Sequence, residues 1–230
     1  MSLIESYESF RNYSEARLKP RDAKSLDQEI WAPLRCTTDM SFLEVGCGTG
    51  LFLNYLQSKG AEDFLGIDQD GKLGRVIAES ISAHFKVTDV WKFLESGADG
   101  RTFDRIVLLD VFEHFTIDEG LNLLNRLTQF LKPSGAILLR MPNGSSPWGL
   151  QYQHGDLTHK TAYTPGSIRQ LAIAAGYRCT RCHGQKTGSP VRRFFDPVIH
   201  GLISHLIMTP PEIWSANFYA ILEPDISVNE

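Results

Sequence analysis

The stretch FLEVGCGTG (residues 42–50) decides the fold, because an apolar run ends there in a glycine-rich turn. Residues 41–46 have the composition of a buried strand, and LFLNYLQSK (51–59) has that of a helix ending at Gly60. Glycines allow positive φ angles and let a ligand approach the backbone closely. A strand, such a turn and a helix in succession predict a ligand-binding site at the carboxyl edge of a parallel sheet.

The glycine spacing indicates which kind of ligand this turn binds. A nicotinamide site has the spacing GxGxxG, with the pyrophosphate at the helix N-terminus. Here Gly46, Gly48 and Gly50 follow GxGxG, and Glu44 stands two residues before the first glycine. A carboxylate at that place repels a pyrophosphate and suits a cationic ligand. The pattern therefore disfavours a nicotinamide enzyme.

Beyond this turn, short apolar runs alternate with helical stretches along the chain. The predicted strands are 41–46, 63–68, 84–89, 103–110, 135–142, 177–183 and 217–224. The predicted helices are 51–59, 72–81, one that begins at Thr116 with the apolar stripe Leu121, Leu124, Leu127 and Leu131, and one from Thr164 to Gly176. This alternation predicts an α/β fold: a doubly wound, Rossmann-like, seven-stranded, mostly parallel sheet with helices on both faces. Because the last two strands lack a helical crossover, we expect the last strand to be antiparallel.

Four acids stand at the ends of four successive predicted strands. They are Glu44, Asp68, Asp89 and Asp110. In a doubly wound sheet these positions face one crevice, where Asp68 can accept hydrogen bonds from ribose hydroxyls and Asp89 can reach an adenine amino group. The alternative is that each acid only caps the helix that follows it. Four acids in register favour the binding site.

As a set, these motifs resemble those of the class I S-adenosylmethionine-dependent methyltransferases, over about residues 38–183 with a seventh strand near 217–224. LEVGCGTG is similar to the first motif of that superfamily, GID to its ribose-binding acid, and TDV to its adenine-contacting acid. LLDVFEH and LKPSGAILLRMPN resemble its fourth-strand and fifth-strand segments. The resemblance implies S-adenosylmethionine as the cofactor.

The resemblance also implies a role for each matching position. The implied cofactor-binding residues are Glu44, Gly46, Cys47, Gly48, Gly50, Asp68, Gln69, Asp89, Val90, Asp110 and Val111. The glycines would shape the pocket around the methionine part, and Glu44 would lie near its ammonium group. Asp68 would hold the ribose, and Asp89 with Val90 would frame the adenine. Asp110 and Val111 would lie near the sulfonium.

HGDLTH (residues 154–159) lies in a long irregular stretch after the fifth predicted strand, at the same edge as the expected cofactor site. A hydroxyl nucleophile must lose its proton as it attacks a methyl group, and a positioned histidine contributes about 10²–10⁴ in rate. We interpret His159 as the candidate base and Asp156 as its partner or as a ligand for a substrate hydroxyl. His154 and His114 are further catalytic candidates.

Two other interpretations of this loop stay open. His154, Asp156 and His159 offer two imidazoles and one carboxylate, the ligand set of some divalent-metal sites. Six residues of one loop leave little freedom for three ligands to converge, so we predict no metal site. In the remaining interpretation Asp156 and Thr158 only cap the loop.

DVFEHF, RMPN and DLTHKTAYTPGSI resemble a branch of the superfamily that is associated with methylation of sugars and cell-surface polysaccharides. The resemblance implies O-methylation of a sugar or polysaccharide-related acceptor. A quinone, a phenol or another small-molecule natural product is the alternative acceptor. A protein that binds S-adenosylmethionine without turnover is the alternative from another functional class.

Composition and charge exclude several classes of protein. The chain has 230 residues, of which 42% are hydrophobic and 22% charged, as in an ordinary globular protein. A net charge of −4 argues against nucleic-acid binding, and the local basic pair Arg192–Arg193 is too short to change this. We expect a cytoplasmic protein, because the sequence has neither a secretory signal pattern nor an apolar run long enough for a transmembrane helix.

We expect one methyltransferase domain over residues 1–230. Its parts are a helical extension or lid (1–37), the core (38–183), an apolar insertion (184–216), and the last strand with a tail (217–230). The insertion could cover the active site, pair with a second copy in a homodimer, rest on a membrane surface or pack on its own domain.

Overall fold

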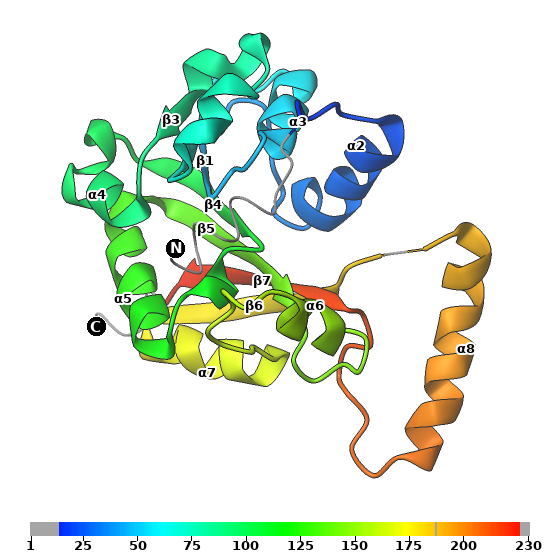
Figure 1. Ribbon diagram of the computed structural model, residues 1–230. Helices are drawn as coiled ribbons and strands as arrows, with labels where there is room; N and C mark the ends of the chain where they lie inside the picture. Colours follow the sequence, from blue (N-terminus) through cyan, green and yellow to red (C-terminus); the bar gives the residue numbers. More distant parts are fainter. Residues whose placement is uncertain (1–13, 187, 226–230) are drawn as a thin grey trace.

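The computed structural model describes residues 14–186 and 188–225, and a seven-stranded sheet runs through its centre (Figure 1). The strands are β1 (Phe42–Val45), β2 (Phe64–Asp68), β3 (Phe85–Val87), β4 (Phe103–Leu109), β5 (Leu131–Pro142), β6 (Tyr177–Gly184) and β7 (Asn217–Pro224). Their order is β3-β2-β1-β4-β5-β7-β6. β1 to β5 pair in parallel, and β7 lies antiparallel between β5 and β6. The predicted fold class and the antiparallel last strand are therefore confirmed.

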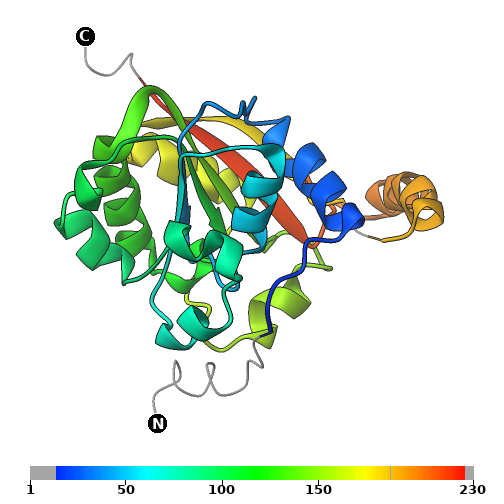
Figure 2. The same cartoon turned by 90° about the horizontal axis from the view of Figure 1, so that it is seen from above.

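Helices cover both faces of this sheet (Figure 2). They are α2 (Pro20–Leu26), α3 (Leu51–Lys59), α4 (Val90–Glu95), α5 (Ile117–Leu127), α6 (Leu150–Gly155), α7 (Pro165–Ala174) and α8 (Pro190–Leu206). Side chains of α4, α5 and α7 bury one face, and side chains of α2, α3 and the π-helical turn Asp27–Trp31 bury the other. Because successive strand residues point to opposite faces, neighbours such as Phe42 and Leu43 enter different cores.

The helices predicted to begin at Thr116 and Thr164 do begin there, and each threonine caps its helix. The Thr116 hydroxyl accepts a hydrogen bond from the Glu119 amide, and Glu119 bonds back to the Thr116 amide. Thr164 caps α7 in the same way, with Pro165 in the first turn. The predicted stripe of α5 was partly wrong: Leu123 is fully buried with Leu124 and Leu127, whereas Leu121 is only partly buried.

The predicted helix over 72–81 is wrong. Two 3₁₀ turns, Gly71–Arg75 and Glu79–His84, take its place and bury Leu73 and Ile81. Glycine disfavours a helix because of the backbone entropy lost on ordering it, and Gly74 lies inside this short segment. The two short turns are enough to bury the apolar side chains of Leu73 and Ile81.

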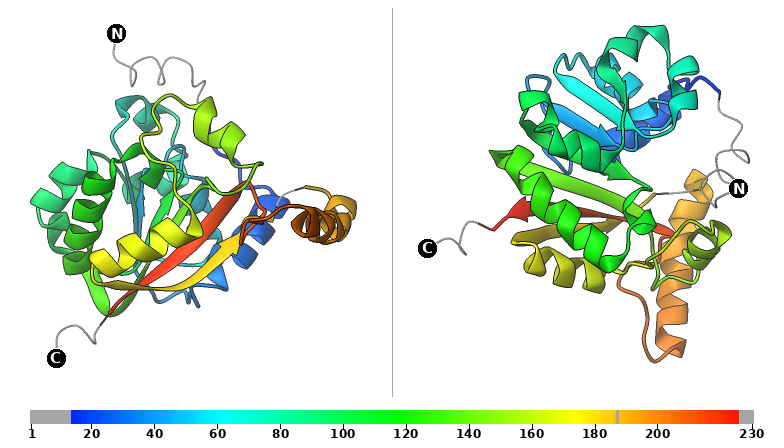
Figure 3. Two further views of the ribbon diagram at one scale, coloured as in Figure 1. Left: turned by 90° about the horizontal axis from the view of Figure 1, so that it is seen from below. Right: turned by 60° about the vertical axis from the view of Figure 1, so that its left-hand side comes forward.

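Two segments for which no helix was predicted contain helices. α6 lies inside the predicted loop 143–163 and carries His154. α8 lies inside the insertion 184–216 and stands out from the body of the molecule (Figure 3). No helix among the described residues has both the length and the apolar character needed to cross a membrane.

Candidate active site at the carboxyl edge of the sheet

The glycine turn after β1 has the backbone conformation that its sequence predicts. Gly46, Gly48 and Gly50 have φ angles of +70°, +52° and +78°. A Cβ at Gly46 would lie 2.4 Å from a methyl carbon of Val111, so only glycine fits there. A Cβ at Gly48 would meet nothing within 4 Å. The turn therefore packs against Val111 at one end and has open space above Gly48.

Glu44 points a buried carboxylate toward this edge. It is 3% exposed, and its Oε2 has no hydrogen-bond partner among the described residues. Burial raises the pKa of Glu44 well above its ordinary value, although the charge of Arg140 opposes that shift. Cys47 is buried within the turn, and burial likewise raises the pKa of its thiol. A cationic group stabilises a buried carboxylate that has no partner. Glu44 therefore suits the cationic ligand that the sequence predicts at this position.

Asp68 ties the glycine turn to the end of β2. Its Oδ2 accepts the Gly48 amide at 2.9 Å, and its Oδ1 accepts the Asp70 amide at 3.0 Å. Burial raises the pKa of Asp68 against the effect of these two hydrogen bonds. A carboxylate has about four acceptor positions, so Asp68 keeps positions for further donors. The neighbouring Gln69 is exposed.

For Asp89 the helix-capping interpretation is correct. Its Oδ1 accepts the amides of Trp91 and Lys92 at 2.9 and 3.3 Å and so caps α4. Val90 is buried in the first turn of that helix. The second oxygen of Asp89 takes no part in these bonds, so capping and ligand contact are compatible.

Asp110 follows β4 and is held by Arg140, a residue that the sequence reasoning missed. The Arg140 Nε donates to Asp110 Oδ1 at 2.9 Å, and its Nη2 donates to Oδ2. Asp110 has a φ angle of +57°, which is unusual for a residue other than glycine and typical of functional turns. The position of this arginine inside the apolar run GAILLRMP was the feature of the sequence that could have identified it.

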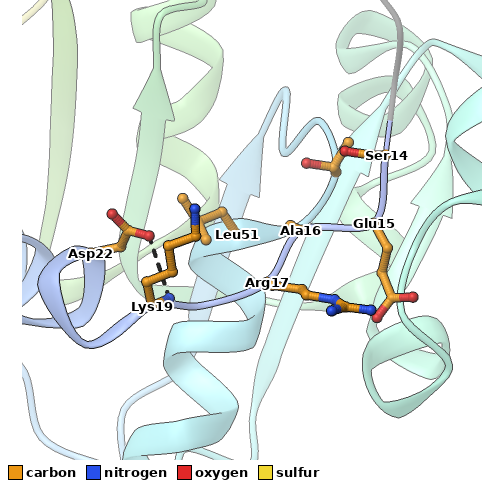
Figure 4. Close-up of a pocket in the computed structure, with 8 residues that line it drawn as sticks. Ser14, Glu15, Ala16, Arg17, Lys19, Asp22 and Leu51 are labelled. Carbon is orange, nitrogen blue, oxygen red and sulfur yellow. Dashed lines mark hydrogen bonds between the residues drawn. The ribbon is translucent and has the colours of Figure 1, made fainter.

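A hollow of about 590 Å³ lies between the irregular residues 14–19 and the start of α3 (Figure 4). Its lining residues are Ser14, Glu15, Ala16, Arg17, Lys19, Asp22, Thr49 and Leu51. Because Thr49 belongs to the glycine turn, this N-terminal segment borders the expected cofactor site. Its role as a lid stays a prediction, and residues 1–13 lie outside the described part of the chain.

A second group of polar side chains follows Asp110 directly. The 3₁₀ turn Phe112–His114 carries Glu113 and His114. The backbone carbonyl of Glu113 accepts the amides of Lys160 and Thr161 at 2.9 and 3.1 Å. These two bonds fasten the end of the HGDLTH loop to the end of β4.

His114 and His159 meet across this junction. Their ring centroids are 4.7 Å apart, with the rings 73° from coplanar. The Nε2 of His159 lies 3.8 Å from Glu113 Oε1 and 3.9 Å from Asp156 Oδ2. The predicted residues His159, His114 and Asp156 therefore come together, although 45 positions separate His114 from His159 in the numbering.

Glu113 is the acid at the centre of this group, and the sequence reasoning missed it. It is 1% exposed, and neither of its carboxylate oxygens has a hydrogen-bond partner among the described residues. Burial, followed by the charge of Asp110, raises the pKa of Glu113 to about 8. Its place between Asp110 and His114 in DVFEH was the available signal.

His154 does not join the group. It is exposed near the end of α6, so the predicted catalytic role of His154 has no geometric support. The metal triad weighed from the sequence, His154 with Asp156 and His159, is likewise not formed. The helix α6 is the physical reason, since it turns His154 outward while the following residues fold back to Glu113.

Asp156 both orders the loop and faces the cluster. Its Oδ1 accepts the amide and the hydroxyl of Thr158 at 2.9 and 2.6 Å, as the loop-capping interpretation predicts. Burial opposes ionisation, but these two hydrogen bonds outweigh it and lower the pKa of Asp156. A charged Asp156 thus lies beside His159.

Comparison with known proteins gives the family and the fold of the chain. The family described as "Methyltransferase domain" matches residues 10–181, more than half of the chain. No curated protein sequence matches. A SAM-dependent methyltransferase from Archaeoglobus fulgidus has a similar structure, with 19% identity, a TM-score of 0.69, and coverage of 95% of this chain and 98% of its own.

Two further solved structures have the same fold. The magnesium protoporphyrin IX methyltransferase of Synechocystis, solved with SAM, is 14% identical with a TM-score of 0.58, covering 94% of this chain and 90% of its own. The mitomycin 7-O-methyltransferase is 10% identical with a TM-score of 0.60, covering 88% of this chain and 52% of its own.

Proposed function

Since the chain belongs to the methyltransferase-domain family, we propose that it transfers the methyl group of S-adenosylmethionine to a hydroxyl oxygen of a sugar or polysaccharide-related acceptor. In this reaction the acceptor oxygen bonds to the methyl carbon as the carbon–sulfur bond breaks. The sulfonium becomes a neutral thioether, and the hydroxyl proton leaves. The chain has to position the two reactants in line and to provide for that proton.

The cofactor assignment is supported by the chemistry of the residues around the glycine turn. Glu44 offers a buried carboxylate for the methionine ammonium, and Asp68 has acceptor positions left for ribose hydroxyls. The open space above Gly48 suits a close approach of ligand to backbone. Asp89 with Val90 and Asp110 with Val111 stay as the proposed contacts at the adenine and sulfonium ends.

The cluster of Glu113, His114 and His159 is the observation that carries the choice of an oxygen acceptor. It follows Asp110 directly in the chain, so the acceptor's hydroxyl and the cofactor's methyl group can meet at one edge of the sheet. His159 donates from Nδ1 to the Gln153 carbonyl at 3.0 Å, which leaves its Nε2 lone pair toward the cluster. An imidazole held in this way is suited to activating a hydroxyl.

A phenol or another natural-product hydroxyl is the second candidate acceptor. The mitomycin 7-O-methyltransferase, which has the same fold, favours it. The apolar side chains of α8 do not decide between these acceptors, because α8 projects from the body of the molecule (Figure 1) and these side chains are exposed. We treat residues 1–230 as one methyltransferase domain, with 14–37 beside the cofactor turn and the end of 184–216 hydrogen-bonded to the loop that follows β5.

The experiment is methyl transfer from labelled S-adenosylmethionine to a panel of sugars, phenols and natural-product hydroxyls. On any acceptor found, we expect His159→Ala to lower turnover by about 100-fold or more, because hydroxyl activation is lost. His154→Ala is the matched control from the same loop and should stay within about threefold of wild type. If His159→Ala also stays within that range, the catalytic assignment is wrong.

A further inference from the structure

We propose that Glu113, His114 and His159 bind one divalent transition-metal cation, and that this cation holds and acidifies the acceptor hydroxyl. The role assigned to the cation rests on the proposed function, whereas the binding site does not. The sequence led us to expect no metal, because the three ligands then considered all lay within one short loop. In the structure the carboxylate and one histidine come instead from the turn after β4.

The spacing of the three side chains is the first argument. One ligand atom from each of Glu113, His114 and His159 lies within 4.8 Å of the others. The Nε2 of His159 and the Oε1 of Glu113 are 3.8 Å apart, which is too long for a hydrogen bond. Two ligands about 2.1 Å from one ion are separated by roughly 3.0–4.2 Å, so the distance suits a shared cation.

The orientation of both imidazoles is the second argument. His159 Nδ1 lies 3.0 Å from the Gln153 carbonyl, which can only accept, so Nδ1 carries the proton. The Thr158 hydroxyl donates to Asp156 and therefore accepts from His114 Nδ1 at 3.0 Å. The Nε2 atoms of both rings then carry the lone pairs. Metal-binding histidines are typically held in this manner, with the other ring nitrogen donating to a carbonyl or to a carboxylate-linked group.

The burial of Glu113 is the third argument. Its side chain is 1% exposed, and both carboxylate oxygens have no hydrogen-bond partner among the described residues. Leaving a buried carboxylate without a donor or a counter-charge is costly. Of the charges that act on Glu113, those of Asp110 and Asp156 oppose its ionisation, and that of Arg140, which is itself paired with Asp110, favours it. A bound cation would stabilise the carboxylate directly.

The donor set indicates the class of ion. Two imidazoles and one carboxylate suit manganese, iron, cobalt or zinc better than calcium, which prefers oxygen ligands. Asp156 lies beside His159, with Oδ2 3.9 Å from its Nε2, and adds a second negative charge near the ion. Three protein ligands leave coordination positions for the oxygens of an acceptor.

This site changes the role of His159. A hydroxyl bound to a divalent cation loses its proton far more readily than a free hydroxyl. With the ion bound, His159 is a ligand, and the proton passes to solvent rather than to its imidazole. Adjacent hydroxyls, as in a sugar or a catechol, would occupy two of the open positions together.

The test is Mn²⁺ binding by the full chain after removal of metals with EDTA. We expect one Mn²⁺ per chain by calorimetry, and a bound-ion signal by electron paramagnetic resonance. Glu113→Gln, His114→Ala and His159→Ala should each weaken binding by about 100-fold, because each removes one ligand. His154→Ala should bind as wild type, and circular dichroism should show every variant folded.

Two results would overturn the site. In the first, folded, metal-free wild type binds no Mn²⁺. In the second, the three variants bind as tightly as wild type, and the ion lies elsewhere. Titration with S-adenosylmethionine in EDTA separates the two proposals. If the protein binds S-adenosylmethionine but not Mn²⁺, only the metal site is wrong. If it binds Mn²⁺ but not S-adenosylmethionine, only the proposed methyltransferase function is wrong.

Discussion

Gly46 and Gly48 have similar positive φ angles, yet their surroundings predict different consequences for an added methyl group. Gly46→Ala places Cβ 2.4 Å from Val111 and should cost about 3 kcal/mol in the free energy of unfolding. Gly48→Ala meets no atom within 4 Å, so only the left-handed conformation costs energy, about 1 kcal/mol. Urea denaturation of both variants measures the difference. Equal losses would show that Val111 does not pack against the turn.

Individual residues show how far the site could be predicted from the sequence. The glycine turn, Glu44, Asp68 and Asp110 were predictable because strand ends in a parallel sheet share one edge. Arg140 and Glu113 were not, because their partners are distant in sequence. Arg140 pairs with Asp110 across neighbouring strands, and Glu113 meets His159 only after the loop folds back. Neither contact can be predicted from the spacing of these residues along the chain.

The strands were predicted well because burial on both faces leaves continuous apolar runs such as IVLL in β4. The short helical segments were predicted less well. The segment 72–81 has helical composition, but the burial of Leu73 and Ile81 determines its conformation. The helix α6 lies in a stretch with no periodic apolar pattern. Tertiary contacts decide such short elements, and local propensity is too weak to fix them.

Asp104 joins three strands and predicts a pH dependence of stability. Its Oδ2 accepts hydrogen bonds from the Ser41 amide before β1 at 2.8 Å and from the Lys132 Nζ in β5 at 2.7 Å. Burial opposes ionisation, but Lys132 and Ser41 outweigh it and lower the pKa of Asp104. The folded pKa is thus below the unfolded value of about 3.9, so the stabilisation is present above that pH and is lost as the pH falls.

We therefore expect Asp104→Asn to lower the free energy of unfolding by about 1–2 kcal/mol at pH 7. The difference from wild type should shrink as the pH falls below about 4, because the wild-type carboxyl then becomes protonated as well. Urea denaturation at several pH values measures this. Glu62→Gln, an exposed carboxylate, is the control and should show little change at any pH. A loss that is independent of pH would mean that packing, rather than charge, holds the three strands.

At the scale of the whole molecule, α8 contributes none of its described side chains to either hydrophobic core. Its polar side holds it to the body: the ring of His200 stacks on Trp214, with centroids 4.8 Å apart. Its apolar side chains face outward, with Phe194 73% and Leu202 67% exposed. Of the possibilities left open for the insertion, packing on its own domain does not account for these exposed side chains. Contact with a second copy and contact with a membrane surface both stay predictions.

The rest of the molecule is organised around one edge of the sheet. The glycine turn and the cluster after β4 lie at the carboxyl ends of adjacent parallel strands, one suited to a cationic cofactor and the other to an acceptor hydroxyl. The central claim is that S-adenosylmethionine occupies the first of these places. The catalytic role proposed for the second place depends on a methyl donor beside it.

The most direct test is calorimetric titration of the cofactor-free, EDTA-treated protein with S-adenosylmethionine, S-adenosylhomocysteine and NAD. The account predicts one site per chain with micromolar affinity for both sulfur compounds and no binding of NAD. If folded protein binds neither sulfur compound, the account is contradicted, and Glu44 and Asp68 have structural roles only.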